Sequence, residues 1–512
     1  MRSCCSILDG SLAVSGFRCF REALGAAAAS SLVLRWMAAP WDLWACWPAS
    51  LPGRAFTMFY ALLDFLSLRV RTGLHPALKE SIALRMLAYA QAMPASPAWR
   101  GSAILRALDL PAGASRGRVS WIPAMVLGTV LLLVPFAPTA VSVMLVWSCG
   151  ALCLALRLWG NRFFFPRGFV APGVAFIVVL CLSTATSLSP GSSLEALVLW
   201  ATYVLLAALL AMSLDDMGKV GFVLLCLLVS ASLSGAYGLY QFSRGIETQS
   251  AWLDKEAAKV IQTRVYSVFD NPNMFAAYLA FLLPLAAYLF LNTPRWSSRI
   301  LMLPVGVLMV GGLAFTYTRG AWVGSAVGLA ALGFLRDRKV LLVMLAVMVA
   351  APFLFPLTVL DRFSTIGSLE DSSNLYRLTI WRATWLMVKD YWASGVGLGP
   401  VPYTLVYPLY EIAGTPTVHA HNLYLQVLVE MGLPGLLVFL WLMRNAFRAS
   451  LSLRGSPYHS GIVLALVAGL VGQVIYGLAD NIWYSPKNLF LFWAVVGMIA
   501  ASSAALGSVE SP

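Results

Sequence analysis

Twelve apolar segments, each about as long as a bilayer crossing requires, occupy most of the sequence after residue 120. A transmembrane helix needs about 20 mainly apolar residues, and only a helix or a closed barrel satisfies its backbone inside hydrocarbon. The chain is 60% hydrophobic and 11% charged, whereas soluble domains have about 25% charged residues. These observations predict an all-α, polytopic membrane protein of about twelve transmembrane helices. The predicted spans are 121–136, 138–157, 168–188, 194–213, 218–240, 271–292, 299–317, 320–335, 340–359, 421–443, 460–479 and 488–506.

The positions of the basic loops predict how these spans are oriented. The loops after the second, sixth, eighth and tenth spans are basic, and all four fall on one side if every span is real. Basic loops face the cytoplasm in membrane proteins, so both termini are expected there. The basic residues of these loops are Arg157, Arg162, Arg167, Arg295, Arg299, Arg336, Arg338, Lys339, Arg444, Arg448 and Arg454.

The net charge of +13 is shared between these loops and the N-terminal region. Residues 1–118 hold 13 Lys and Arg against 6 Asp and Glu. Their mixture of Trp, Leu and Arg favours helices lying on an inner-leaflet surface. This distribution excludes a nucleic-acid-binding function. We therefore predict a basic, amphipathic cytoplasmic N-terminal region of unknown role over 1–118, followed by a twelve-span membrane domain over 119–512. The eight cysteines indicate no disulfide framework or metal site.

The long connection over 360–420, between the ninth and tenth spans, is predicted to be external. Long loops in compact proteins usually carry function. Within this loop, Tyr376 to Trp392 is predicted to form an amphipathic helix, which the glycine-rich run 395–400 ends. Its tryptophans favour a position at the level of the lipid headgroups.

Two histidines lie at the start of the tenth span, His419 just before it and His421 as its first residue. An imidazole exchanges a proton near neutral pH, and at the edge of a bilayer it suggests chemistry on a lipid-borne substrate. The alternative is a histidine that only caps or anchors the helix. Glu430, deeper in the same span, is expected to pair with a buried polar group.

Three arginines are expected on the external side, where the positive-inside tendency does not favour them: Arg319, Arg377 and Arg382. Guanidinium groups match phosphate oxygens in geometry, so several around one cavity would suit a pyrophosphate. Contact with lipid headgroups is the alternative for each arginine alone. The sequence holds no external carboxylate cluster for a hard cation and no phosphate-binding P-loop motif. It therefore implies no metal and no cofactor.

Four motifs over residues 190–500 resemble those of the bacterial O-antigen ligase and O-antigen polymerase superfamily. His421-Asn422 is followed by Gly432 and Gly435 at the spacing of O-antigen ligases. The other three motifs are Phe269-Asp270-Asn271-Pro272-Asn273, Thr318-Arg319-Gly320-Ala321-Trp322, and Arg377 with Trp381 followed by the glycine-rich run. Residues 1–118 lie outside the resemblance.

The resemblance implies a metal-independent, inverting glycosyltransferase of the GT-C type in the bacterial cytoplasmic (inner) membrane. Its active site would face the periplasm or cell exterior. The donor would be a glycan on undecaprenyl pyrophosphate, and the acceptor a hydroxyl of a glycan, lipid or protein. By motif the catalytic residues are His421, Arg319 and Arg377, with Arg382 a rival for the last. Arg382, Asn422, Asn273 and His419 are the further candidates for substrate binding, although Asn273 is also a candidate cap or positioning residue of the sixth span.

Among acceptors, a lipid A core would define an O-antigen ligase, which the His-Asn motif favours. A second lipid-linked repeat would define a polymerase, and a protein hydroxyl an O-oligosaccharyltransferase. A flippase or exporter of lipid-linked saccharides, which binds the same donor without chemistry, is the alternative outside the enzyme class. Against it, the polar residues gather at one face and no inverted repeat is detectable.

Overall fold

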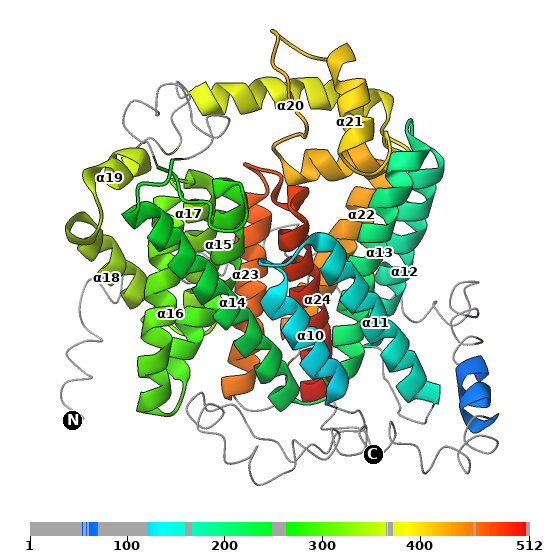
Figure 1. Ribbon diagram of the computed structural model, residues 1–512, viewed down its shortest axis with the longest axis horizontal. Helices are drawn as coiled ribbons and strands as arrows, with labels where there is room; N and C mark the ends of the chain where they lie inside the picture. Colours follow the sequence, from blue (N-terminus) through cyan, green and yellow to red (C-terminus); the bar gives the residue numbers. More distant parts are fainter. Residues whose placement is uncertain are drawn as a thin grey trace, which may run out of the picture.

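The computed structural model describes residues 61–69, 121–158, 166–247, 263–364, 372–451 and 457–507, together with residues 54, 58, 366 and 453. It is an all-α bundle (Figure 1). Its helices are α10 (Ile122–Leu133), α11 (Thr139–Leu158), α12 (Arg167–Ala185), α13 (Pro190–Ser213), α14 (Met217–Ser243), α15 (Pro272–Asn292), α16 (Trp296–Phe315), α17 (Arg319–Leu335), α18 (Lys339–Leu354), α19 (Leu357–Ser364), α20 (Ser372–Asp390), α21 (Pro400–Val406), α22 (Leu423–Leu451), α23 (Pro457–Tyr476) and α24 (Pro486–Gly507), with short 3-10 helices η4 (Tyr407–Leu409) and η5 (Ile482–Tyr484).

Each of the twelve predicted spans corresponds to a helix, which confirms the predicted fold class. Among the described residues, nine helices are long and apolar enough to cross a membrane, and α10, α17 and α18 are shorter apolar helices. α15 and α24 are the most enclosed of the nine. α15 packs against α16 and α23, whereas α24 packs against α13.

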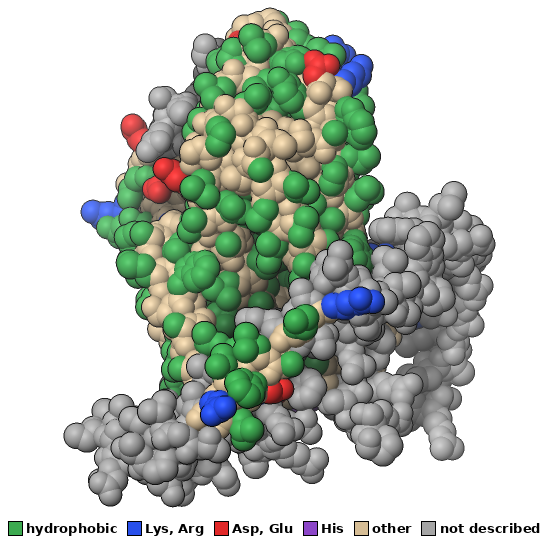
Figure 2. Space-filling model, turned by 90° about the vertical axis from the view of Figure 1, so that its right-hand side faces the viewer, with side chains coloured by type: hydrophobic (Ala, Val, Ile, Leu, Met, Phe, Trp, Pro, Cys, Tyr) green, Lys and Arg blue, Asp and Glu red, His purple; other side chains and the backbone are tan. Residues whose placement is uncertain are grey.

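The flank formed by α11, α12 and α13 presents apolar side chains outward. Figure 2 shows this face covered largely by hydrophobic side chains, with few charged ones among them. Ile177, Val178 and Leu182 of α12 are exposed, as are Leu194 and Val198 of α13. An apolar surface of this extent is unfavourable in water and is the surface expected of a protein that faces lipid.

Local sequence signals set where several helices begin. Asn271 caps α15 by accepting a hydrogen bond from Asn273 N, and Pro272 occupies the first helical position. Asp216 caps α14 in the same way. The side chain of Asn422 accepts from Tyr424 N and Leu425 N and so caps α22. The capping role considered for Asn273 therefore belongs to Asn271.

The predicted helix in the long connection is present as α20, which lies across one end of the bundle beside α21 (Figure 1). We call this end the α20 end. Ile380, Met387 and other buried residues of α20 form a small core with Tyr403, Ala420 and Val429. Trp385 and Trp392 are exposed. This second core holds the long connection firmly against α22.

α22 is broken near its middle at Gly432, whose φ is +66°. The break leaves Val429 O and Glu430 O available to the glycine-rich run. Val396 N donates to Val429 O (2.7 Å), and Gly397 N donates to Glu430 O (3.3 Å). The Glu430 carboxylate accepts a hydrogen bond from Gln426 Nε2 (2.6 Å), as expected for a buried carboxyl group.

Most of the predicted N-terminal region lies outside the described residues. Within it, residues 61–69 are helical, and Asp64 pairs with Arg157 of α11. The predicted division at residue 118 stays a prediction.

Candidate functional site

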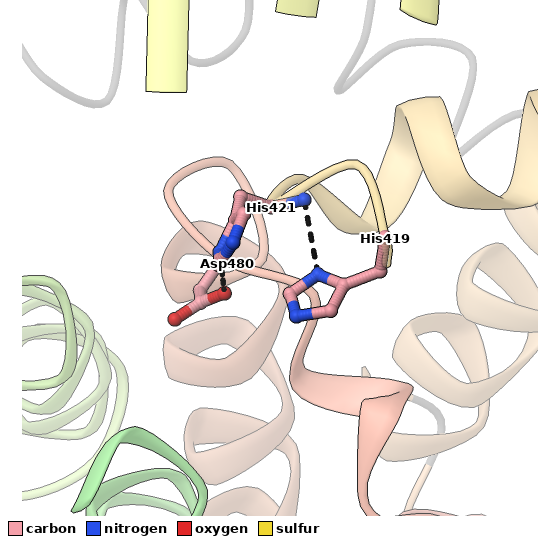
Figure 3. Close-up of side chains that lie close together, drawn as sticks. All are labelled: His419, His421 and Asp480. Carbon is pink, nitrogen blue, oxygen red and sulfur yellow. Dashed lines mark hydrogen bonds and ion pairs between the residues drawn. The ribbon is translucent and has the colours of Figure 1, made fainter. Parts of the chain in front are cut away.

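His421 and Asp480 face each other at the α20 end, although 59 residues separate them in sequence (Figure 3). His421 lies two residues before the start of α22, and Asp480 lies in the connection between α23 and α24. The His421 Nδ1 atom is 3.1 Å from Asp480 Oδ1. The Asp480 side chain is 1% exposed and that of His421 is 17% exposed. The imidazole of His421 is therefore partly accessible to solvent, while the carboxylate of Asp480 is buried.

The backbone of His421 is held in an unusual conformation. Its φ is +47°, in the left-handed region that non-glycine residues seldom occupy. Trp381 Nε1 of α20 donates to His421 O (3.1 Å), and His421 N donates to Nδ1 of His419 (3.2 Å). Ala420 N donates to Gln426 Oε1 (2.7 Å). Strained residues of this kind cluster at functional sites and persist only when their surroundings determine them.

The position of Asp480 determines which nitrogen of His421 can act as a base. A carboxylate only accepts hydrogen bonds, so the proton belongs on Nδ1. The lone pair of the neutral ring is then on Nε2. The tautomer follows from the hydrogen-bond network, and it is the one that a general base at this site needs.

Asp480 stays ionised because of its neighbours. Burial alone would raise its pKa, but the hydrogen bond with His421 and the positive charge of Arg377 hold the pKa of this carboxyl well below its usual range. Asp480 also accepts from Asn273 Nδ2 (2.8 Å) and from Asn481 N (2.9 Å). A buried carboxylate with this many donors is satisfied, so it forms a fixed negative charge behind the imidazole.

The arginines predicted from the sequence occupy different places. Arg377 of α20 lies 3.8 Å from Asp480 Oδ2, measured from Nη2, and thus belongs to the His421 cluster. Arg382, one and a half turns further along α20, is exposed and lines an open groove. Arg319 is the first residue of α17. The next residue, Gly320, lies against Tyr476 and Ala479, so the start of α17 adjoins the chain segment that leads to Asp480.

Asn273 and Asn422 were both predicted to bind substrate, and the side-chain amide of each forms hydrogen bonds with other groups of the protein. Asn273 bridges Asp480 and Arg264, because its Oδ1 accepts from Arg264 Nη2 (2.9 Å). Asn422 caps α22 and donates from Nδ2 to Leu478 O (2.8 Å). Both amides therefore contribute to the frame that positions the site.

His419 is 4% exposed, and its ring packs 4.0 Å from that of His421 and 4.5 Å from that of Tyr484 between centroids. Burial is the main cause that lowers the pKa of His419 to about 3. Its Nδ1 accepts the backbone N–H of His421. His419 is thus a neutral ring that supports the loop on which His421 lies.

His419, His421 and Asp480 could offer ligand atoms to a cation, since one such atom from each lies within 4.8 Å of the others. One feature opposes a metal ion at this place, because the guanidinium of Arg377 already faces the same carboxylate. A second positive charge there would be repelled.

An open groove of about 300 Å³ lies beside the cluster, lined by Leu378, Trp381, Arg382, Trp385 and Leu425. Its volume is within the range of small-molecule sites. Trp381 belongs both to this groove and to the contacts of His421. The groove therefore adjoins the backbone of His421.

These features define an all-α, polytopic membrane protein with a His–Asp–Arg cluster at one end of its helix bundle. Residues 304–440 match the family described as O-antigen ligase. This match confirms the resemblance predicted from the sequence, and it covers Arg319, Arg377 and His421 but neither Asn273 nor Asp480.

The chain is also similar to the teichuronic acid biosynthesis protein TuaE of Bacillus subtilis (strain 168). The two are 24% identical over 258 residues, which is 46% of this chain and 51% of TuaE. The chain thus spans about half the length of this curated relative.

Sequence reasoning did not find Asp480 or Arg264. Asp480 stands alone in a short connection, with no second carboxylate nearby to mark it. The signal that could have found it is an ionisable residue at the edge of an apolar span. Arg264 precedes the Phe269–Asn273 motif by five residues, but no spacing rule connects it to His421.

Proposed function

We propose that this protein transfers a glycan from an undecaprenyl-pyrophosphate-linked donor to an acceptor hydroxyl at the outer face of the bacterial cytoplasmic membrane. The family match and the similarity to a teichuronic acid biosynthesis protein support a membrane enzyme of polysaccharide biosynthesis, of the ligase or polymerase kind. The single observation that carries the proposal is the pairing of His421 with Asp480 beside Arg377.

In the proposed reaction, Nε2 of His421 removes the proton of the acceptor hydroxyl. A hydroxyl is a poor nucleophile until a base takes its proton in the transition state. Asp480 holds the ring in the required tautomer and stabilises the imidazolium that forms, as the aspartate does in serine hydrolases. The acceptor oxygen then bonds to the anomeric carbon as the bond to the pyrophosphate breaks, which inverts the configuration at that carbon.

The leaving pyrophosphate gains negative charge as its bond to the sugar breaks. Guanidinium groups fixed near that position stabilise the charge without reorganising. Arg377 is the nearest candidate by its contact with Asp480. Arg319 is the second, because α17 begins beside the segment that ends at Asp480. In this proposal neither arginine needs a metal ion to assist it.

The groove beside α20 suits the polyprenyl chain of the donor. Four of its five lining residues are Leu or Trp, and Arg382 supplies one positive charge. The chain would lie along the apolar wall while its phosphates turn toward Arg377. The acceptor in this proposal is a lipid A core, with a second lipid-linked repeat or a protein hydroxyl as the alternatives that the same site could use.

Transfer by the purified protein tests the proposal. Protein in detergent, given a lipid-linked oligosaccharide and a core acceptor, should form product without ATP and in the presence of EDTA. A protein that moves the donor across vesicle membranes but transfers no glycan would be a flippase, and the proposal would fail. Transfer that EDTA abolishes would preserve the reaction and contradict its metal independence.

A further inference from the structure

Arg264 lies in the short segment before α15, outside the family match. Its Nε donates to Thr316 O (2.9 Å), and its Nη2 donates to Asn273 Oδ1 (2.9 Å) and Thr318 Oγ1 (3.3 Å). These acceptors belong to the connection before α17 and to the first turn of α15. One guanidinium thus joins the two segments that carry Arg319 and Asn273.

These hydrogen bonds determine which way the Asn273 amide faces. A guanidinium can only donate, so Arg264 holds the amide oxygen toward itself. The Thr318 hydroxyl lies 3.2 Å from the same oxygen and reinforces this orientation. The amide nitrogen is then directed at Asp480 Oδ2, 2.8 Å away. The reversed amide would place an oxygen against the carboxylate and an N–H against the guanidinium.

A continuous series of contacts therefore runs from Arg264 through Asn273 and Asp480 to His421. Asp480 presents Oδ2 to Asn273 and Oδ1 to His421. The amide restrains the carboxylate at one oxygen, which fixes the direction of the other oxygen toward the imidazole. Replacing Arg264 should therefore leave the orientation of the His421 ring less restrained.

The charged and titratable side chains around His421 come from several elements. Asp480 faces it from the α23–α24 connection, and Arg377 and Tyr376 approach from α20. His419 stacks on it from its own loop, and Arg264 lies behind Asn273. The positive charge of Arg264 opposes the attraction of Asp480 for a proton on the imidazole. Burial, and next the charge of Arg362, lower the pKa of Arg264 to about 10, which leaves it charged at neutral pH.

We infer that Arg264 is a positioning residue for the His421 base, which it serves by orienting Asp480 through the Asn273 amide and by weakening the hold of Asp480 on a proton at the imidazole. The inference rests on the proposed function, because it assigns a role within the same reaction. It adds Arg264 to Asp480 and Arg377 among the charged residues around His421, at a position that the motifs did not indicate.

Steady-state kinetics of Arg264→Gln and Arg264→Lys separate this role from direct contact with phosphate. Arg264→Gln should lower kcat by roughly tenfold to a hundredfold, as small misplacements of catalytic groups do. The acid side of its pH–rate profile should move up by about half a pH unit, because a positive charge near the base is lost. KM for the lipid donor should stay within about twofold. Arg264→Lys should restore the pH profile and only part of kcat, because an ammonium keeps the charge and loses the fork.

The matched control is Arg244→Gln, which removes an exposed arginine at the end of α14 on the same end of the bundle. It should leave kcat and the pH profile unchanged. A raised donor KM with an unchanged pH profile in Arg264→Gln would make Arg264 a phosphate contact and would overturn the inference. Equal losses in Arg264→Gln and Arg244→Gln would also overturn it.

A double-mutant cycle tests the route through Asp480. If Arg264 acts through this carboxylate, Arg264→Gln added to Asp480→Asn should cost less than about twofold beyond Asp480→Asn alone. Additive losses would mean that the two residues act separately, which the inference does not allow.

A readout without turnover distinguishes failure of this inference from failure of the proposed function. Hydrogen–deuterium exchange at C2 of the His421 ring, followed by mass spectrometry against pH, reports protonation of that ring directly. Its midpoint should rise in Arg264→Gln and not in Arg244→Gln, whether or not the protein transfers glycans. An unchanged midpoint in Arg264→Gln would contradict the positioning role of Arg264. A raised midpoint in a protein without transferase activity would contradict only the proposed reaction.

Discussion

Trp381 Nε1 donates a hydrogen bond to the backbone carbonyl of His421 over 3.1 Å, and this bond connects the long α20 connection to the candidate base. The same indole lines the groove beside α20. A ligand in the groove would therefore contact the same side chain that holds the backbone of His421.

The roles of His421 and Asp480 can be separated from substrate binding. His421→Ala should lower kcat by on the order of 10²–10⁴, the usual loss when general-base assistance is removed. Donor affinity should remain nearly intact, because a neutral ring contributes little to holding a pyrophosphate. Asp480→Asn should lower kcat by a smaller factor. Glu247→Gln, which changes an exposed carboxylate that follows α14, is the control and should have no effect. A His421→Ala protein with normal single-turnover rates contradicts the mechanism.

Arg377 and Arg382 are expected to differ, since only Arg377 reaches Asp480. Arg377→Ala should weaken donor binding and turnover together, because its charge faces phosphate in both the ground state and the transition state. Arg377→Lys should recover part of both. Arg382→Ala should raise the donor KM with a smaller effect on kcat. Binding assays with the lipid-linked donor and single-turnover rates decide between them, and the reverse ranking would exchange their assignments.

Gly432 is expected to be intolerant of a side chain. Its φ is +66°, and a Cβ there would lie 2.7 Å from Ala393 O. Gly432→Ala should destabilise the protein by about 1–3 kcal/mol, the cost of a residue held in an unfavourable backbone region. Gly306→Ala in α16 is the matched control, because a Cβ there meets nothing within 4 Å. Thermal unfolding in detergent measures both, and equal midpoints would show that the break in α22 carries no constraint.

The buried His419 predicts how stability depends on pH. Its pKa falls from 6.5 to about 3 in the folded protein, chiefly through burial. Below pH 6.5 the unfolded chain therefore binds a proton at His419 that the folded chain does not bind. The free energy of unfolding then decreases by ~1.4 kcal/mol for each pH unit of acidification, until about pH 3. His419→Gln should remove this slope and leave the behaviour above pH 6.5 unchanged. Unfolding free energies measured between pH 4 and 8 give the result, and parallel curves would exclude a neutral His419 in the native state.

Orientation in the membrane can be tested with single cysteines in a background without the native ones. Leu409→Cys lies at the α20 end, where Leu409 is 80% exposed. It should react with an impermeant maleimide in intact cells. Arg338→Cys, in the connection between α17 and α18 at the opposite end, should be protected. Labelling of Arg338→Cys alone would place the His421 cluster on the cytoplasmic side, away from the proposed donor.

The sequence by itself determined the all-α membrane fold and the positions of the helices. An apolar segment of about 20 residues has few alternatives in a bilayer, because its backbone must satisfy its own hydrogen bonds. The helix predicted in the long connection also came from a local pattern, whereas the candidate set His421, Arg319 and Arg377 came from motifs that resemble those of O-antigen ligases and stays a prediction. In each case the determining information lies within a few turns of chain.

Only the tertiary structure decided which of these residues meet. Asp480 reaches His421 across 59 residues, and Asn273 reaches Asp480 across 207. Asn422 proved to be a helix cap, and Arg382 lies in the groove and not among the Asp480 contacts. The physical reason is that a single Asp or Arg forms no repeating pattern in the sequence from which its contacts could be predicted. Its partner is set by how α15, α17, α20 and α23 pack against one another, which depends on contacts distributed over the whole chain.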